Sequence, residues 1–288
     1  MRGRHGWRRV AISSLGLIAI LALAFAASAA GRGGRAQGPA RYWGGTAVDP
    51  GPPVPITQAP GSNTPVLSVR PHRPAHPDQT LSNEFTYTQW AYVAGLANAY
   101  WMPDTHSRVI ARLTQYTEDG FPSVYIALRS HWDKLGREWV LIRIPGRPNG
   151  RTGWVFRGTL GAFHLTHLAL TVNREQMRMY FYRNGRRIWS APVGVGRPSM
   201  PTPTGHFWIN EEFTLPQSNP YYPFAFGTTD ASSLSDWPGG GWVGIHGPYG
   251  APASAIPGQI SHGCIRLRIP DAAWLGHHLQ IGTPLHVV

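Results

Sequence analysis

Residues 261–267 read Ser261-His262-Gly263-Cys264-Ile265-Arg266-Leu267 and contain the single cysteine of this 288-residue chain. One cysteine cannot close an intrachain disulfide, so a fold held together by disulfides is excluded. A lone thiol beside histidines has a chemical explanation as a nucleophile, because an imidazole can take the proton of a thiol whose free pKa is about 8.5. The stretch therefore points to nucleophilic chemistry at Cys264.

Two histidines are candidates for assisting Cys264. His262 lies two residues before the cysteine, so on an extended strand both side chains would share one face. His246 lies in Gly244-Ile245-His246-Gly247, with fourteen residues between it and Ser261, and the fold would have to bring it to the thiol. The residue pattern alone leaves both imidazoles open as the base.

Other motifs surround this pair in a defined order along the chain. They are Pro201-Thr202-Pro203-Thr204-Gly205-His206-Phe207-Trp208-Ile209, then the histidine and cysteine motifs, then Asp271 and Gly282-Thr283-Pro284. Together they resemble the L,D-transpeptidase catalytic domain, the YkuD-like fold, whose signature is a histidine followed at this spacing by Ser/Thr-His-Gly-Cys. The resemblance covers about residues 164–288 and implies a β-sandwich or barrel with short helices.

The resemblance implies an enzyme that transfers acyl groups between peptidoglycan stem peptides. Cys264 would attack the carbonyl of the diamino-acid residue at stem position three, expel the terminal D-alanine and form a thioester. A side-chain amine of a neighbouring stem would resolve the thioester and give a 3→3 cross-link. Carbapenem-type inhibitors are expected to acylate the same thiol, and we expect neither a cofactor nor a metal.

The resemblance also implies roles for the residues around Cys264. His246 would be the base, and the backbone carbonyl of Gly247 would orient its imidazole. The N–H groups of Gly263 and Cys264 are the natural donors to an oxyanion, because charge develops on the carbonyl oxygen in the transition state. His262 would shape or polarise the pocket.

Two further residues are candidates for binding the substrate. Arg266 could pair with a substrate carboxylate, or it could form a structural salt bridge with Asp271 or another acid. Ser261 is the second candidate, although its hydroxyl is better suited to fixing the loop through hydrogen bonds to the backbone. Aromatic residues of 221–227 and 237–242 could line a donor groove or pack in the core.

The sequence predicts two β-rich domains, 81–162 and 163–288. In the second, Asn184-Gly185 between two apolar runs predicts a hairpin, Asp271 could cap a helix over Ala272–Leu279, and a final strand is expected over Pro284–Val288. In the first, short apolar runs at regular spacing predict a small β-barrel, and Gly153-Trp154-Val155 resembles a strand of bacterial SH3-like domains. Its aromatics could bind a peptide or glycan or form the core: Trp90, Tyr92, Tyr100, Trp101, Trp132, Trp139 and Trp154.

Most of the net charge of +12 lies before these domains. Residues 1–41 carry seven arginines and no acid, so the later part is only mildly basic and, without a basic stripe or a recognisable motif, nucleic acid is not an expected partner. Residues 1–30 are predicted to be a signal peptide or a membrane anchor, because basic residues precede an apolar run from Val10 to about Ala26 and small residues follow it. A Pro/Gly-rich linker over 31–80 follows, so we expect an extracytoplasmic protein of the cell wall or periplasmic space. The oligomeric state stays open.

Three alternative functions remain at this level. His246, His262 and Cys264 could bind zinc in a metal hydrolase, and His164 and His167 form a second His-x-x-His pattern. The same catalytic fold could transfer the acyl group to water and act as an L,D-carboxypeptidase. The chain could also be a non-catalytic wall-binding protein, which the intact histidine and cysteine motifs argue against.

Overall fold

The computed structural model describes residues 46–47, 78–234 and 241–288. Contacts group Gln37–Val288 into one compact unit, to which all the described residues belong. The predicted leader over 1–30 and most of the predicted linker lie outside the described residues. Within the described part, no helix has the length and apolar character needed to cross a membrane.

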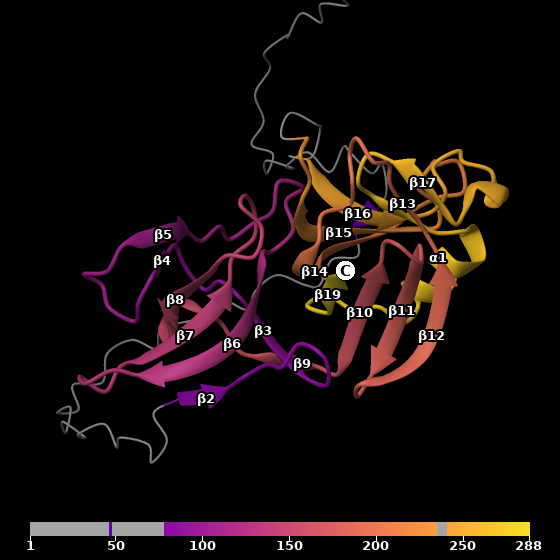
Figure 1. Ribbon diagram of the computed structural model, residues 1–288. Coiled ribbons are helices and arrows are strands. Elements are labelled where there is room, and N and C mark those ends of the chain that lie inside the picture. Colours follow the sequence, from indigo (N-terminus) through magenta and orange to yellow (C-terminus); the bar gives the residue numbers. More distant parts are fainter. Residues whose placement is uncertain (1–45, 48–77, 235–240) are drawn as a thin grey trace, which may run out of the picture. The chain divides into compact units, whose positions relative to one another are not determined.

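The described residues are mainly β, as the sequence predicts. They form two sheets and one α-helix, α1 (Ile269–Gly276), with short 3₁₀ turns at Arg157–Thr159 and Ala253–Ala255 (Figure 1).

The first sheet is antiparallel and has the strand order β5-β4-β8-β7-β6-β3-β9, with β2 beside β6. Its strands are β2 (Asp78–Thr80), β3 (Thr88–Tyr92), β4 (Asn98–Tyr100), β5 (Val109–Arg112), β6 (Val124–Trp132), β7 (Glu138–Arg143), β8 (Thr152–Phe156) and β9 (His164–Thr166). Residues of β9, which the sequence placed in the second domain, pair with β3. The likeness to SH3-like domains stays a prediction.

Three of the seven aromatic residues predicted for this sheet are buried. Trp90, Trp139 and Trp154 are buried, whereas Trp101 is 61% exposed. Tyr92, Tyr100 and Trp132 are partly buried. Core packing therefore accounts for the three buried tryptophans, since large aromatic side chains dominate the energetics of small cores.

The second sheet has the order β12-β11-β10-β19-β14-β15-β16-β18-β13-β17, with β1 beside β14. Its strands are β1 (Thr46–Ala47), β10 (Leu168–Asn173), β11 (Arg178–Arg183), β12 (Arg186–Pro192), β13 (Gly194–Gly196), β14 (Gly205–Thr214), β15 (Phe224–Ala231), β16 (Trp242–His246), β17 (Gly258–Ser261), β18 (Ile265–Arg266) and β19 (Pro284–Val287). Most neighbours are antiparallel, but three pairs run parallel: β10 with β19, β13 with β17, and β16 with β18. The main core lies against this sheet and includes side chains of α1.

Two local predictions for the second sheet are confirmed, and one needs correction. Asn184 and Gly185 form the β11–β12 turn with φ values of 51° and 71°, as this turn type requires. The final strand begins at Pro284 as predicted. The helix, however, spans Ile269–Gly276 rather than Ala272–Leu279. It begins earlier because Pro270 fits its first turn and Asp271 lies inside that turn rather than capping it.

The two sheets contact each other through polar and apolar groups. The Val124 N–H donates to Asn210 Oδ1 at 2.9 Å, and Trp208 Nε1 donates to the Val124 carbonyl at 2.8 Å. Trp90 and Ile126 of the first sheet pack in the same buried cluster as Trp208 of the second. The two predicted domains therefore share part of their core.

Candidate active site

Strand pairing brings the predicted catalytic residues together. In the parallel pair of β16 and β18, Ile245 lies opposite Ile265 and His246 opposite Arg266. Side chains alternate along a strand, and partners on neighbouring strands point to the same face, so Gly244 and His246 share one face with Arg266 and with Cys264, two residues before it. The sheet thus places the thiol, the imidazole and the guanidinium on one side.

These side chains line a cavity of about 150 Å³. Four of the predicted site residues contribute to it, namely His246, His262, Cys264 and Arg266. The remaining walls come from Tyr221, Ser232, Leu234, Gly241, Trp242, Val243 and Tyr249. Tyr221 and Trp242 fall in the aromatic stretches noted in the sequence, but Trp237 lies outside the described residues.

The Cys264 thiol is held in a partly buried position on the cavity wall. Its sulfur accepts a hydrogen bond from the Gly244 N–H, with an N–S distance of 3.4 Å. Burial raises the pKa of the thiol, and the Gly244 N–H and the charge of Arg266 oppose that rise. The thiol is therefore protonated at neutral pH and has a donor ready to stabilise a developing thiolate.

The His246 imidazole is buried, and its orientation is fixed. Its Nδ1 lies 2.7 Å from the Gly247 carbonyl oxygen, the contact that the family resemblance implied. Because a carbonyl oxygen only accepts, Nδ1 carries the proton and Nε2 carries the basic lone pair. Burial lowers the pKa of His246 to about 3; the Gly247 hydrogen bond opposes this shift, and the nearby charge of Arg266 adds a smaller lowering. At neutral pH the ring is a neutral base.

Position 247 has room only for glycine, because the backbone of Tyr221 and Tyr222 passes close to it. A Cβ at this position would lie 1.8 Å from the Tyr222 carbonyl oxygen. The Gly247 N–H also donates to the Tyr221 carbonyl at 3.1 Å. A side chain here would push the 221–222 backbone away and displace the carbonyl that orients His246.

Ser261 fixes the loop that carries the cysteine. Its hydroxyl donates to the Cys264 carbonyl at 2.6 Å and accepts the Gly263 N–H at 3.1 Å. Ser261 is only 1% exposed and is not among the residues that line the cavity, so its contacts are with the loop rather than with the cavity space. The Gly263 N–H is already engaged, which leaves the Cys264 N–H as the remaining donor of the pair predicted for the oxyanion.

Thr202 is a supporting residue that the sequence analysis did not single out. Its hydroxyl donates to the Gly263 carbonyl at 2.7 Å and accepts the Gly196 N–H at 2.9 Å. Gly263 has a φ of 129°, which side-chain-bearing residues rarely adopt. The Pro-Thr-Pro-Thr-Gly motif was the signal for Thr202, but only the fold shows that its side chain reaches the cysteine loop.

Arg266 faces the cavity and not Asp271. The described residues contain four ion pairs, and none of them includes Arg266. Its guanidinium lies over the Tyr249 ring at 5.1 Å, and its Nε is buried without a hydrogen-bond partner among the described residues. The alternative of a salt bridge to Asp271 is therefore wrong, and the cation remains available to a ligand.

The zinc alternative does not fit the geometry of these residues. Among the described residues, one group of three metal-ligating side chains has all its ligand atoms within 4.8 Å of one another, and it consists of Glu84, His206 and His286. His246, His262 and Cys264 do not form such a group, nor do His164 and His167 with a third ligand.

Part of this chain is similar to a known family of catalytic domains. Residues 168–287 match the family model of YkuD, the L,D-transpeptidase catalytic domain. The chain is 30% identical over 114 residues to L,D-transpeptidase 1 of Mycobacterium tuberculosis, which aligns 37% of this chain with 44% of that protein. The alignment thus spans less than half the length of this curated relative.

Similar solved structures include L,D-transpeptidase 3 from Mycobacterium tuberculosis in complex with a faropenem-derived adduct. It is 17% identical, with a TM-score of 0.34, and the match covers 52% of this chain and 90% of that one. Another is an LD transpeptidase, LdtMt1, in complex with imipenem, at 19% identity and a TM-score of 0.37, covering 69% of this chain and 99% of that one. The residues that match the catalytic-domain family, 168–287, include every side chain that lines the cavity.

Proposed function

We propose that this protein is a peptidoglycan L,D-transpeptidase that works through a thioester on Cys264. The observation that carries the proposal is one cavity lined by the Cys264 thiol, by the neutral imidazole of His246, whose Nδ1 is held by the Gly247 carbonyl, and by the cation of Arg266. The match of residues 168–287 to the catalytic-domain family supplies the reaction class.

In the first half-reaction, Sγ of Cys264 attacks the carbonyl carbon of the third stem residue. The thiol proton moves to Nε2 of His246, and a tetrahedral oxyanion forms. When the C–N bond breaks, the imidazolium gives this proton to the departing nitrogen of D-alanine, and the acyl group remains on sulfur as a thioester. The Cys264 N–H is the donor available to the oxyanion.

In the second half-reaction, the side-chain amine of another stem attacks the thioester carbon. His246 takes a proton from the amine, the C–S bond breaks, and sulfur recovers a proton from the imidazolium. The products are a new amide cross-link and the original thiol. Water in place of the amine would release a trimmed stem, which is carboxypeptidase activity.

The charges of Cys264 and His246 before substrate binds determine when the thiol proton moves to the imidazole. Burial raises the pKa of Cys264 and lowers that of His246, so both groups are neutral before substrate binds. An ion pair therefore forms only as Sγ gives its proton to His246 and attacks the substrate carbonyl, and the Gly244 N–H and the charge of Arg266 stabilise the negative charge on sulfur. A resting neutral thiol is also less prone to oxidation than a thiolate.

Arg266 is the group best placed to bind a carboxylate of the donor stem. It lines the cavity, and its buried Nε lacks a partner among the described residues. A charge-assisted hydrogen bond to a carboxylate would satisfy this donor and orient the stem. The same contact would attract the carboxylate of a carbapenem, and imipenem is the ligand in the LdtMt1 structure.

The location and the first sheet complete the proposal. An apolar leader and a linker before the folded part fit a protein that works outside the cytoplasm, where peptidoglycan lies. The first sheet would be an SH3-like module that supports the catalytic sheet.

The test uses the purified full chain with a disaccharide-tetrapeptide, with products analysed by mass spectrometry. We expect loss of D-alanine together with cross-linked dimers, and neither product with Cys264→Ala. Trimmed monomer without dimers would identify a carboxypeptidase instead. If Cys264→Ala leaves the products unchanged, the thioester mechanism is wrong. A carbapenem should add one covalent adduct to the wild type and none to Cys264→Ala.

A further inference from the structure

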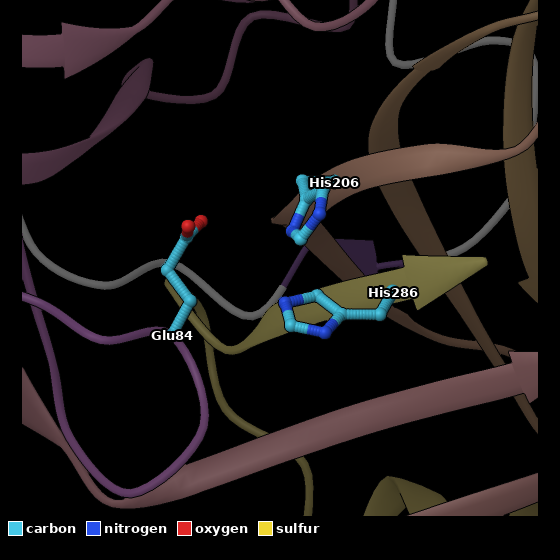
Figure 2. Close-up of side chains that lie close together, drawn as sticks. All are labelled: Glu84, His206 and His286. Carbon is cyan, nitrogen blue, oxygen red and sulfur yellow. The ribbon is translucent and has the colours of Figure 1, made fainter. Parts of the chain in front are cut away.

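A group of metal-ligating side chains lies away from the cysteine cavity. Glu84, in the loop between β2 and β3, lies close to His206 on β14 and His286 on β19 (Figure 2). One ligand atom from each side chain lies within 4.8 Å of the other two. None of the three residues lines the cavity of Cys264.

The two histidines are brought together by strand register. His206 and His286 are directly opposite each other in the antiparallel pair of β14 and β19. Side chains at such positions have Cβ atoms about 5 Å apart, and here the ring centroids are 4.3 Å apart. A cross-strand histidine pair of this kind offers two nitrogen ligands from a rigid sheet.

The third ligand is held by the first sheet in an unusual backbone conformation. Glu84 is 7% exposed and has a φ of 60°, which is uncommon for a residue with a side chain. Such outliers persist where the surrounding structure fixes them, and they concentrate at functional sites. The Glu84 carboxylate is thus fixed in a position that faces the two imidazoles.

A second observation supports ligand binding at this place. The Nε2 atom of His286 is buried and has no hydrogen-bond partner among the described residues. A buried polar atom without a partner costs stability, on the order of 1–3 kcal/mol. A metal ion between the three side chains would use the free lone pair of this nitrogen.

Arg143 limits which metals can bind. Its Nε and Nη2 atoms donate to the two oxygens of Glu84, the latter at 2.6 Å. Each carboxylate oxygen retains another lone pair, and ligating carboxylates in metal sites are commonly hydrogen-bonded to a neighbour. The guanidinium charge disfavours any dication, so the site needs the strong binding that imidazole nitrogens give to zinc, nickel or copper and not to calcium or magnesium.

We propose that Glu84, His206 and His286 form a binding site for a divalent transition metal of the zinc class, with water as the fourth ligand. Zinc–ligand bonds of about 2.0–2.2 Å place neighbouring ligands about 3.4 Å apart, so the side chains must move together by about an ångström when the ion binds. The ion would connect the Glu84 loop of the first sheet to β14 and β19 of the second. Its role is structural, because the site holds no nucleophile of the proposed reaction.

The test measures metal binding and not enzyme activity. The purified full chain, stripped of metal, is titrated with Co²⁺ and followed by visible absorption, and with Zn²⁺ followed by calorimetry and thermal unfolding. We expect one equivalent of Co²⁺ to give the d–d bands of a four-coordinate site without a thiolate charge-transfer band. Zn²⁺ should raise the unfolding temperature.

Matched variants identify the residues. His286→Gln and His206→Gln should each weaken binding at least about tenfold, a loss typical of altered metal sites. His277→Gln, which removes an exposed histidine outside the group, should bind like the wild type. Because His206 is exposed, its variant is expected to fold even if His286→Gln does not.

Several results would overturn the site. They are unchanged Co²⁺ binding in both ligand variants, an equal loss in His277→Gln, or a thiolate charge-transfer band that disappears in Cys264→Ala. None of these outcomes bears on the acyl-transfer test, so the two proposals fail independently.

Discussion

Asn149 of the first sheet binds the backbone of Ala231 in the second through both ends of its amide. Its Nδ2 donates to the Ala231 carbonyl at 3.0 Å, and its Oδ1 accepts the Ala231 N–H at 3.1 Å. Beside it, Arg147 donates from Nε and Nη2 to the Ser232 carbonyl at 3.1 and 2.8 Å. Ser232 lines the cysteine cavity, so a turn of the first sheet supports a wall of the candidate active site.

Asn149→Ala should therefore slow acylation of Cys264 although residue 149 does not line the cavity. The substitution leaves the buried N–H and carbonyl of Ala231 without the side-chain partners they have now, at a cost of about 1–3 kcal/mol for each unpaired group. We expect a lower rate of carbapenem adduct formation, measured by mass spectrometry, with the fold retained by circular dichroism. Asn98→Ala, the same change on β4 of the first sheet, is the control. Equal rates in Asn149→Ala and the wild type would show that the wall does not need this support.

Thr202→Val should loosen the cysteine loop while preserving side-chain volume. The variant removes the donor to the Gly263 carbonyl and the acceptor of the Gly196 N–H, both buried, and should lower the free energy of unfolding by about 1–3 kcal/mol. The rate of acylation should fall more than the loss of folded protein explains, because Gly263 and Cys264 are no longer held in a fixed position. Chemical denaturation and adduct kinetics measure the two effects. Thr204→Val, at an exposed position of the same motif, should change neither.

Arg266→Gln should weaken donor binding more than the chemical step. A charge-assisted hydrogen bond is worth about 1.5–3 kcal/mol, which corresponds to a rise in KM of about tenfold to a hundredfold. Arg187→Gln, at an exposed cation on β12, should leave KM unchanged. A fall in kcat at constant KM would instead indicate that Arg266 acts on the transition state.

The pH profile of acylation should lack the acid limb of an ordinary histidine. An unperturbed imidazole takes up a proton between about pH 8 and 5, and a base with that pKa would lose activity over this range. Burial lowers the pKa of His246 to about 3, so the base stays neutral as the pH falls to 5. We expect kcat/KM for adduct formation to stay constant from about pH 7 to 5 and to rise at alkaline pH, because the thiol pKa is raised. A decline centred near pH 6.5 would contradict the neutral, buried imidazole.

Two aspartates should affect stability with opposite dependence on pH. Burial raises the pKa of Asp230 to about 8, despite the Asn149 contact and the charge of Arg174, so the folded state holds a proton that the unfolded state has released above about pH 4. The contribution of this protonated carboxyl to the free energy of unfolding is therefore lost as the pH rises from about 4 to 8. Asp230→Asn should reduce this loss, and its gain over the wild type in unfolding temperature should grow with pH.

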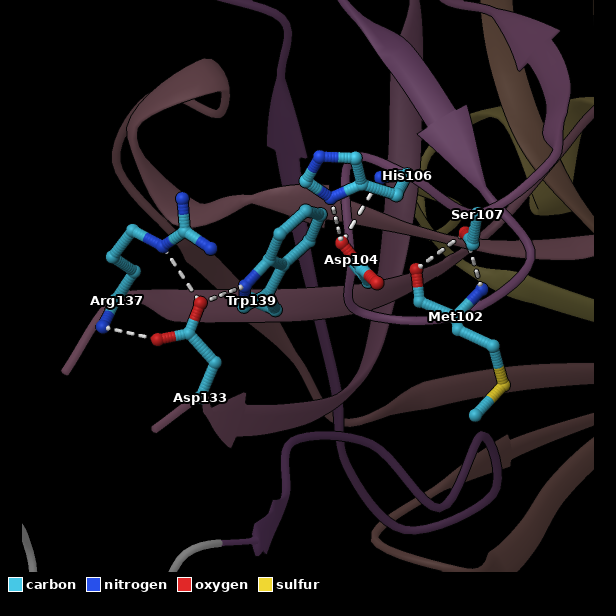
Figure 3. Close-up of polar contacts among 7 residues, drawn as sticks. All are labelled: Met102, Asp104, His106, Ser107, Asp133, Arg137 and Trp139. Carbon is cyan, nitrogen blue, oxygen red and sulfur yellow. Dashed lines mark hydrogen bonds and ion pairs between the residues drawn. The ribbon is translucent and has the colours of Figure 1, made fainter. Parts of the chain in front are cut away.

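Asp133 provides the opposite case and the control. Burial acts to raise its pKa, but hydrogen bonds from Trp139 and Arg137 outweigh it and lower the pKa to about 2 (Figure 3). The ionised Asp133 carboxylate therefore stabilises the folded state above about pH 4, and this stabilisation is lost as the pH falls towards 2. Asp133→Asn should therefore lose stability relative to the wild type at neutral pH and approach it in acid. Parallel pH curves for the Asp230 and Asp133 variants would contradict both assignments.

Local features were predictable from the sequence where short-range physics determines them. Asn184-Gly185 forms its hairpin because both residues tolerate positive φ, and alternating apolar residues on either side fix the strands. The start of the helix was misplaced because a proline can begin a helix as readily as a polar cap, and the sequence offered both.

The sequence could not predict contacts between groups far apart along the chain. Arg266 had two plausible partners, and only the parallel register of β16 and β18 turns it toward the cavity and away from Asp271. Gly263 looked like a free donor until the fold placed the Ser261 hydroxyl on its N–H.

The sequence by itself determined the chemistry at hand: one thiol, two nearby histidines, the glycines around them and the spacing of the motifs. The tertiary structure decided which atoms are free to react, because burial sets the charge of His246 and Cys264, and hydrogen bonds from distant residues occupy some donors and leave others open. It also placed Asn149 against Ala231, a contact that spans 82 positions and depends on how two sheets pack, which no local pattern encodes.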